Sequence, residues 1–142
     1  MKVSKRTEYG LRAIVTLAIL SQEGDQAIPL REIAVAEEIP EQFLDQIFAL
    51  LRREGFVKSV RGPHGGYVLN RPAVDIRMGE VIKALEGTLG PIGCVVDDHP
   101  GDFCEKFQSC HTRNVWLRLS DSITKTLQGI SLADVMHDEI GV

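Results

Sequence analysis

Residues 41–69 read EQFLDQIFALLRREGFVKSVRGPHGGYVL, and this stretch decides the fold that the sequence predicts. Its first part repeats apolar residues on one side of a helix: Phe43, Leu44, Ile47, Leu50 and Leu51. Gly55 ends this helix just after Arg52 and Arg53, where the helix dipole favours positive charge. Two short β-prone runs, FVKSV and YVL, then flank RGPHGG, which predicts a hairpin.

The segment upstream completes a recognisable order of elements. PLREIAVAEE predicts a short helix with Pro29 at its first position, and Ile39-Pro40 breaks it. A short helix, a break, a second helix and a hairpin together indicate a winged helix-turn-helix. Residues 41–53 are then the expected recognition helix.

The recognition helix carries polar residues away from its apolar stripe. Its first turns present Glu41, Gln42, Asp45 and Gln46. Such side chains reach the donor and acceptor groups of base edges in a DNA groove. An ordinary solvated helix face would carry the same residue types, so this pattern alone leaves both interpretations open.

The hairpin favours the DNA-binding interpretation, because it directly follows the helix-turn-helix pattern. Gly62, Gly65 and Gly66 remove side chains that would obstruct close approach to a duplex. Arg61 is then expected to enter a minor groove or contact phosphate, and Lys58 and Arg53 to neutralise phosphates. The alternative is a glycine-rich surface hairpin without a partner.

Composition and charge are compatible with this fold. The chain has 142 residues and a net charge of −4. This length is enough for one domain to fold without disulfides or a structural metal. Basic residues cluster at the start and middle of the chain, and acidic residues cluster in the cysteine-containing loop and at the end. This distribution is compatible with DNA binding, although solvated surfaces would show the same charges. The first 20 residues resemble a signal peptide, but Arg6, Glu8 and Arg12 interrupt the apolar run. We therefore expect an amphipathic helix, no membrane span and a cytoplasmic protein.

The remaining chain predicts more helices around a cysteine-containing loop. IRMGEVIKALEG is a helix, and a long helix runs from about residue 112 to 128 before the short helix SLADVM. The long helix has a stripe at Trp116, Leu119, Ile123 and Leu127 that is too long for a small domain to bury alone, although an intramolecular core is the alternative. The predicted fold class is mainly α with a small β-hairpin wing. Its parts are a winged-helix domain (1–88), a cysteine loop (89–111) and a dimerisation region (112–142).

All three cysteines lie in that loop, as Cys94, Cys104 and Cys110. Thiolates bind soft metals and iron–sulfur clusters. The alternatives are inert thiols, a thiol switch, or a zinc site, although the loop lacks the short Cys-x2-Cys pairs common in structural zinc sites. A nucleophilic pair of Cys110 with His111 is disfavoured, because adjacent residues seldom point at each other and no third orienting group stands out. We therefore do not expect an enzyme.

The residues above carry a resemblance to a known family. SVRGPHGGYVL, preceded by FLDQIFALLRREGFV, resembles the winged-helix iron–sulfur regulators that include IscR, NsrR and RirA. The opening MKVSKRTEYGLRAI, the cysteine loop, VWLRLSDSITKTL and ISLADV match this family in order. The resemblance implies a homodimer on a pseudo-palindromic operator, with Gln42, Asp45 and Gln46 facing DNA and Arg61 in the minor groove. It also implies a two-iron or four-iron cluster on the three cysteines.

The fourth cluster ligand departs from the family pattern. IscR-like proteins have a histidine three residues after the third cysteine, where this chain has Arg113, which stays protonated. In NsrR-like members an acidic residue of the first helix reaches the cluster of the other subunit, and by this resemblance Glu8, acting across the dimer, is the main candidate. His111 is weaker, and His99 and the loop aspartates are lesser candidates.

The expected function is a DNA-binding transcriptional regulator controlled by its cluster. Its signal would be iron–sulfur status, iron, redox state or nitric oxide. The alternative is a cluster-free regulator of the same fold that acts through cysteine oxidation or a partner protein.

Overall fold

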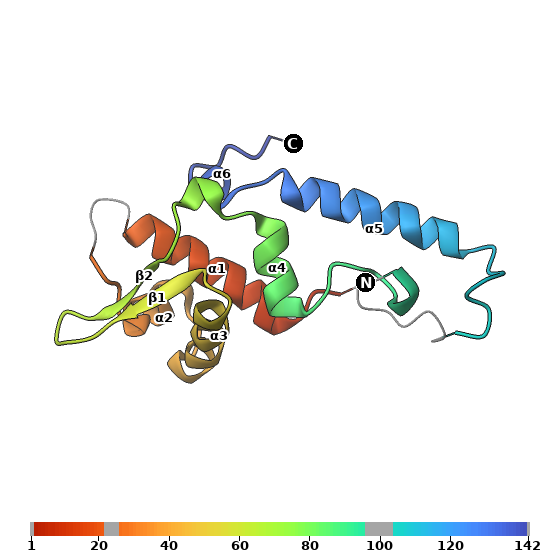
Figure 1. The fold of residues 1–142 in the computed structure, drawn as a ribbon. Helices are drawn as coiled ribbons and strands as arrows, with labels where there is room; N and C mark the ends of the chain where they lie inside the picture. Colours follow the sequence, from red (N-terminus) through yellow and green to blue (C-terminus); the bar gives the residue numbers. More distant parts are fainter. Residues whose placement is uncertain (1, 22–25, 96–103, 142) are drawn as a thin grey trace.

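The computed structural model describes residues 2–21, 26–95 and 104–141, and it is mainly helical with one two-stranded hairpin (Figure 1). The predicted fold class is confirmed. The elements in chain order are α1 (Lys5–Leu20), α2 (Leu30–Glu37), α3 (Glu41–Arg53), β1 (Val57–Val60), β2 (Gly66–Leu69), η1 (Ala73–Asp75), α4 (Met78–Glu86), η2 (Gly93–Val95), α5 (Arg113–Gln128) and α6 (Leu132–Met136).

The turn between α2 and α3 lies at the expected place. Glu38 ends α2 in the left-handed conformation, with φ 56°. This reverses the chain, so that Ile39 enters the core and Pro40 caps α3. Pro29 precedes α2 as its N-cap with ψ 142°, so the prediction that it is the first helical residue was wrong by one position.

One apolar core joins the helices of the winged-helix body. Its fully buried members include Ile14 and Leu17 of α1, Phe48 and Leu51 of α3, and Leu85 of α4. Burial of such side chains contributes roughly 1.5–3 kcal/mol each. This core fixes α3 against α1 and α4 and leaves the opposite side of α3 to solvent.

The C-terminal helix α6 returns to the same core. Leu132 is fully buried there, and its backbone N–H donates to the carbonyl of Ile76 at 2.8 Å. The N–H of Met78 donates in turn to the carbonyl of Ile130 at 2.9 Å. The C-terminal end of α5 is therefore connected to the body, whereas the rest of α5 extends away from it (Figure 1).

The hairpin is antiparallel and has an additional bridge that the sequence did not predict. Its register pairs Val57 with Leu69 and Val60 with Gly66. Ile28 and Tyr67 also exchange two backbone hydrogen bonds, each 2.9 Å long. Because a single bridging residue has no periodic pattern, only the folded chain reveals that the segment before α2 supports the wing.

The described helices include none that is long and apolar enough to cross a bilayer.

Candidate nucleic-acid interface and cysteine site

The helix α3 divides cleanly into a buried side and an exposed side. Leu44, Ile47, Phe48 and Leu51 are buried, whereas Gln42, Asp45 and Gln46 are exposed, as is Glu41. The buried side chains orient the helix, so the exposed amides and carboxylate point away from the core. This arrangement matches a helix that presents polar groups to base edges.

The C-terminal end of α3 is connected to the wing. Arg52 Nη1 donates to Ser59 Oγ of β1 at 3.5 Å. Arg53 lies beside it, with Nε 3.7 Å from a carboxylate oxygen of Glu54, and both side chains are largely exposed. Since exposed pairs of this kind contribute little, Arg53 can exchange Glu54 for a phosphate at low cost.

The wing is held to α3 through an aromatic contact. The rings of Phe48 and Tyr67 lie 4.9 Å apart between centroids. Lys58, Arg61 and Gly62, which the sequence predicted to meet DNA, are all exposed. A contact between buried Phe48 and the wing strand therefore fixes where the exposed wing tip lies relative to α3.

The wing glycines have a different physical reason from the one expected. A Cβ on Gly65 would lie 2.2 Å from the carbonyl oxygen of Val60, and one on Gly66 would lie 2.4 Å from that of Ile28. These two glycines permit close backbone contacts inside the protein. Gly62, with φ 111°, faces open space at the tip and is the one of the three that keeps the outward surface clear.

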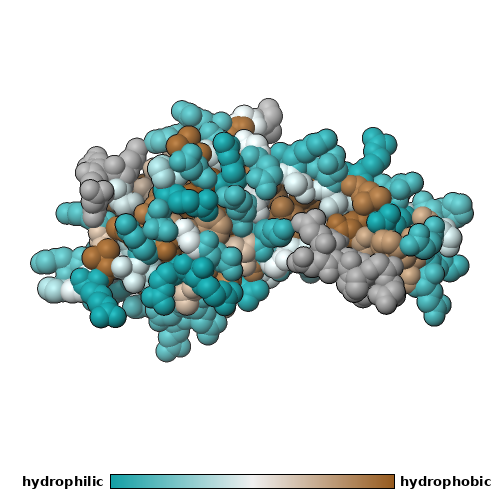
Figure 2. Space-filling view, in the orientation of Figure 1, coloured by the Kyte–Doolittle hydropathy of each residue, from teal (hydrophilic) through white to brown (hydrophobic). Residues whose placement is uncertain are grey.

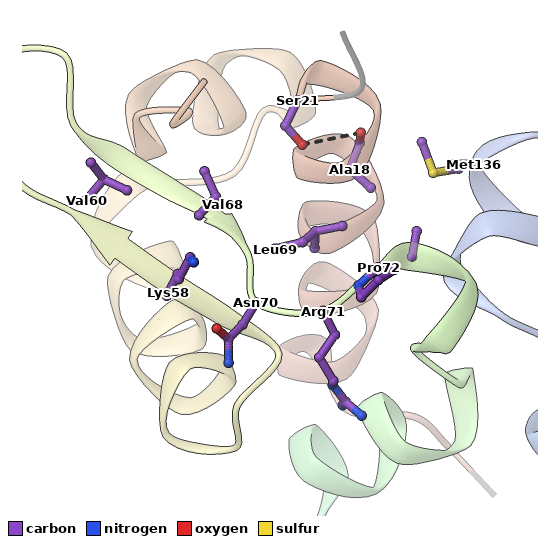
Figure 3. Close-up of a pocket in the computed structure, with 11 residues that line it drawn as sticks. Ala18, Ser21, Lys58, Val60, Val68, Leu69, Asn70, Arg71, Pro72 and Met136 are labelled. Carbon is purple, nitrogen blue, oxygen red and sulfur yellow. Dashed lines mark hydrogen bonds between the residues drawn. The ribbon is translucent and has the colours of Figure 1, made fainter. Parts of the chain in front are cut away.

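An open groove of about 690 Å³ lies between the wing, the end of α1 and η1 (Figure 3). Lys58 and Arg71 are its charged lining residues. Arg71 is already engaged, because its guanidinium lies 4.8 Å from the Phe56 ring centroid and 3.5 Å from a Glu80 oxygen. None of the lining residues is a carboxylate, imidazole or thiol, so the groove itself supplies no acid–base or nucleophilic pair.

The three cysteines are not joined in disulfides, and they occupy different environments. Cys94 lies in η2, which packs against α5, and it is half-buried. Cys104 is exposed in a turn, and Cys110 is half-buried just before α5. Their segment therefore runs from the end of α4 to the start of α5.

The thiol of Cys110 lies within hydrogen-bond distance of a neighbouring hydroxyl. Its Sγ lies 3.2 Å from Thr112 Oγ1. Hydrogen bonds from the Thr112 side chain and backbone, then from the Arg113 backbone, lower the pKa of Cys110, and the positive charge of Lys106 adds to this. Because a thiolate is both the metal ligand and the nucleophile, this geometry favours either role. The sequence analysis missed Thr112, whose role depends on a local turn rather than on a motif.

Within one protomer, the described residues contain no group of three histidine, cysteine or acidic side chains close enough to hold a metal ion. His99 and the loop aspartates Asp97, Asp98 and Asp102 lie outside the described residues. The donor set itself suits an iron–sulfur cluster, because three thiols, one with a lowered pKa, are soft ligands for iron.

The predicted fourth ligands lie at the protein surface. Glu8 is exposed in the first turn of α1, with its carboxylate 3.2 Å from Lys5 Nζ. His111 is also exposed. Arg113 stacks on Phe107 instead, with its guanidinium 4.3 Å from the ring centroid. Its Nε is buried and has no hydrogen-bond partner among the described residues.

The helix α5 leaves apolar side chains uncovered. None of its 16 residues is fully buried, and Val115 is 59% exposed. Trp116, Leu119, Ile123 and Leu127 are only partly buried. Figure 2 shows hydrophobic surface gathered over this part of the molecule.

Comparisons with known proteins agree with these features. The sequence profile of the Rrf2 family, described as an iron-dependent transcriptional regulator, matches residues 3–138. The HTH-type transcriptional regulator IscR of Cereibacter sphaeroides is 34% identical over 140 residues, covering 99% of this chain and 90% of that protein.

Two solved structures are similar over nearly the whole chain. The global cysteine regulator CymR of B. subtilis has a TM-score of 0.77 and 31% identity, covering 96% of this chain and 97% of that one. IscR of T. potens has a TM-score of 0.76 and 36% identity, covering 98% of this chain and 88% of that one. All these relatives are regulators rather than enzymes.

Proposed function

The chain belongs to the Rrf2 family of transcriptional regulators, and from this premise we propose that an iron–sulfur cluster on Cys94, Cys104 and Cys110 controls its binding to DNA. It acts in the cytoplasm as a homodimer on a pseudo-palindromic operator. Gln42, Asp45 and Gln46 read bases, while Arg53, Lys58, Arg61 and Gly62 form the phosphate and minor-groove contacts.

The observation that carries the proposal is the placement of the cysteines. All three lie on the segment that joins α4 of the winged-helix body to α5, and η2 with Cys94 packs against α5. A cluster bound to the three thiols would therefore restrict how the body and α5 move relative to each other. When bound, the cluster supplies a cross-link that is lost or altered by oxidation, iron limitation or nitric oxide.

The dimer is supported by the surface of α5. Its partly buried stripe needs a partner, and a second copy of the same helix provides a complementary apolar surface. In a two-fold dimer the α5 helices set the distance between the two α3 helices. Because half-site spacing on DNA is geometrically strict, a change at α5 would alter operator affinity.

Single alanine substitutions at the three cysteines test the coordination. After anaerobic reconstitution, each variant should lose visible absorbance and bound iron and sulfide, and its operator affinity should no longer respond to cluster removal. Ser109→Ala is the matched control, because Ser109 is exposed between Cys104 and Cys110. Full iron and sulfide content in all three cysteine variants would refute the cluster.

The fourth ligand is tested separately. We expect Glu8→Ala to shift the absorbance or Mössbauer spectrum of the reconstituted protein more than His111→Ala does. Unchanged spectra in both variants would remove both residues as ligands, while leaving the role of the cysteines intact.

The second candidate is a cluster-free thiol switch, which the lowered pKa of Cys110 favours. In this case a peroxide would oxidise the Cys110 thiolate to a sulfenic acid, releasing water after protonation. Protein isolated without oxygen would be colourless, and its DNA affinity would change with peroxide and recover with a thiol reductant. Cys110→Ser would abolish the response of DNA affinity to peroxide. The colour of the anaerobically isolated wild-type protein separates the two candidates, because the cluster proposal predicts a brown protein.

A further inference from the structure

We propose that Arg6 of α1 and Arg52 of α3 extend the phosphate contact assigned above to Arg53, so that a second helix takes part in binding the DNA backbone. This inference rests on the proposed DNA binding and extends it to a residue of α1. We call the site the phosphate groove. Its lining residues are Arg6, Gln46, Ala49, Leu50, Arg52 and Arg53.

The shape of the phosphate groove suits a strand of DNA backbone. It is open, and its volume is about 630 Å³. Gln46 belongs both to this groove and to the base-reading side of α3, so the two surfaces are continuous. Ala49 is exposed, and its short side chain lets a phosphate approach the helix closely. A duplex whose bases meet Gln46 therefore brings its flanking phosphates to the groove.

The charges of the groove call for an anion. Three of the six lining residues are arginines, and none is acidic. The hydrogen bonds of Arg6 and Arg52 go to neutral oxygens, and Arg53 has a weak exposed contact with Glu54. Arg6 also interacts electrostatically with Glu86, so the net positive charge of the groove is less than three. Like charges around one groove repel each other, and a bound polyanion removes this repulsion.

Arg6 is held in place before any ligand arrives. Its Nε donates to the carbonyl oxygen of Leu85 at 2.9 Å. The helix α1 approaches α4 closely at Gly10, where a Cβ would lie 2.6 Å from Leu85 Cδ1. The bond to Leu85 uses one of the five guanidinium donors, so the others remain for phosphate oxygens.

The neighbouring carboxylate of Glu86 attracts the charge of Arg6 and also orders the start of α1. Its Oε2 accepts hydrogen bonds from Ser4 Oγ at 2.8 Å and from the Thr7 hydroxyl. These bonds fasten the start of α1 to the end of α4, so the position of Arg6 depends on the helix that leads to the cysteine segment.

The test measures DNA affinity against salt for Arg6→Gln and Arg52→Gln. Two duplexes of equal length serve as probes: one selected by this protein from a random-sequence pool, and one of unrelated sequence. Each variant should lower affinity for both duplexes by roughly eight-fold per half-site near 0.1 M salt, because each lost phosphate contact reduces the slope of log K against log[salt] by about 0.9. Fluorescence anisotropy on the full-length protein gives both quantities.

Three further variants separate phosphate contact from other roles. Gln46→Ala should weaken binding to the selected duplex alone and leave the salt slope unchanged. Lys125→Gln removes an exposed charge at 2.9 Å from Asp121 on α5 and should change neither quantity. Arg6→Lys keeps the positive charge and should retain most of the slope that Arg6→Gln loses.

The proposal is overturned if Arg6→Gln keeps the wild-type slope and affinity. It is equally overturned if Arg6→Lys loses as much as Arg6→Gln together with thermal stability, because Arg6 would then serve only to hold Leu85. The proposal also fails if the arginine variants bind DNA normally but bind an acidic protein partner more weakly in a salt-dependent way. The groove would then be a protein-binding site. Failure of the cluster proposal would be seen separately. The DNA affinity of the wild-type protein would then not change on cluster removal, whereas its salt dependence could still be measured.

Discussion

The winged-helix body and the α5 region bury apolar surface in different ways. The body places side chains such as Phe48 and Leu51 at 0% exposure inside one chain. In α5 no residue is fully buried, although the helix has the same length as α1. Because apolar burial is the main favourable term in folding, the body is complete within one protomer, whereas α5 needs a further surface. The difference is the one that the proposed dimer requires, with folding complete in the body and the apolar surface of α5 left for a second copy.

The largest expected effect comes from the core of the body. Phe48→Ala should lower the free energy of unfolding by about 3–5 kcal/mol, because it removes a fully buried ring that also contacts Tyr67. Val115→Ala on α5 should change it by less than about 0.5 kcal/mol. The free energy of unfolding of both variants is measured with urea in proteins that also carry Leu119→Asp. This substitution is expected to prevent dimerisation, so the values describe one protomer. Equal losses would mean that α5 is as fully packed as the body.

Association should depend on the stripe of α5. Leu119→Asp places a charge in the apolar stripe and should weaken the dimer at least 100-fold, about 2.8 kcal/mol. Asn114→Asp, at an exposed position roughly on the other side of the helix, is the matched control. Sedimentation equilibrium measures both. A Leu119→Asp dimer as tight as the wild type would contradict the assignment of α5 to association.

The junction between the two regions should respond to pH through Glu86. Hydrogen bonds from the side chains of Thr7 and Ser4 lower the pKa of Glu86 below its ordinary value of 4.5. A carboxylate with a lowered pKa stabilises the fold above its unfolded pKa, and this contribution is lost as pH falls through the folded pKa. Glu86→Gln should therefore destabilise the protein by roughly 1.5 kcal/mol at pH 7.

The difference in the free energy of unfolding between the wild type and Glu86→Gln should decrease below about pH 4. Urea unfolding at several pH values measures this difference. A gap of constant size down to pH 3 would show that the charge of Glu86 contributes nothing at this junction. Glu80→Gln, at a more exposed acidic position of the same helix, controls for the loss of a carboxylate.

The smallest expected effect lies where α6 rejoins the body. Ser131 Oγ accepts from the Asp134 N–H at 3.1 Å, and Asp134 Oδ2 accepts from the Ser131 N–H at 2.9 Å, forming a capping box. Ser131→Ala should cost about 1 kcal/mol and speed hydrogen exchange of α6 amides. If the amides of α3 exchanged faster to the same extent, α6 and the recognition helix would unfold locally as one unit.

The recognition helix and hairpin that carry the proposed DNA contacts were predictable because their signals are local. The stripe in residues 41–53 fixed which sides of α3 are buried and exposed, and the observed bounds, Glu41–Arg53, match the predicted ones. The glycine-rich turn likewise predicted the hairpin and left Arg61 at its tip. Each of these inferences depends on neighbours a few residues apart, which the sequence displays directly.

Tertiary structure alone decided how distant segments meet. Ile28 supports the wing through Tyr67, Leu132 enters the core from the far end of the chain, and Arg6 reaches the groove beside Gln46. The sequence by itself determined the winged helix-turn-helix, the apolar stripe of α5 and the confinement of every thiol to one segment. Contacts across dozens of residues depend on how whole helices pack, and no local periodicity encodes that packing.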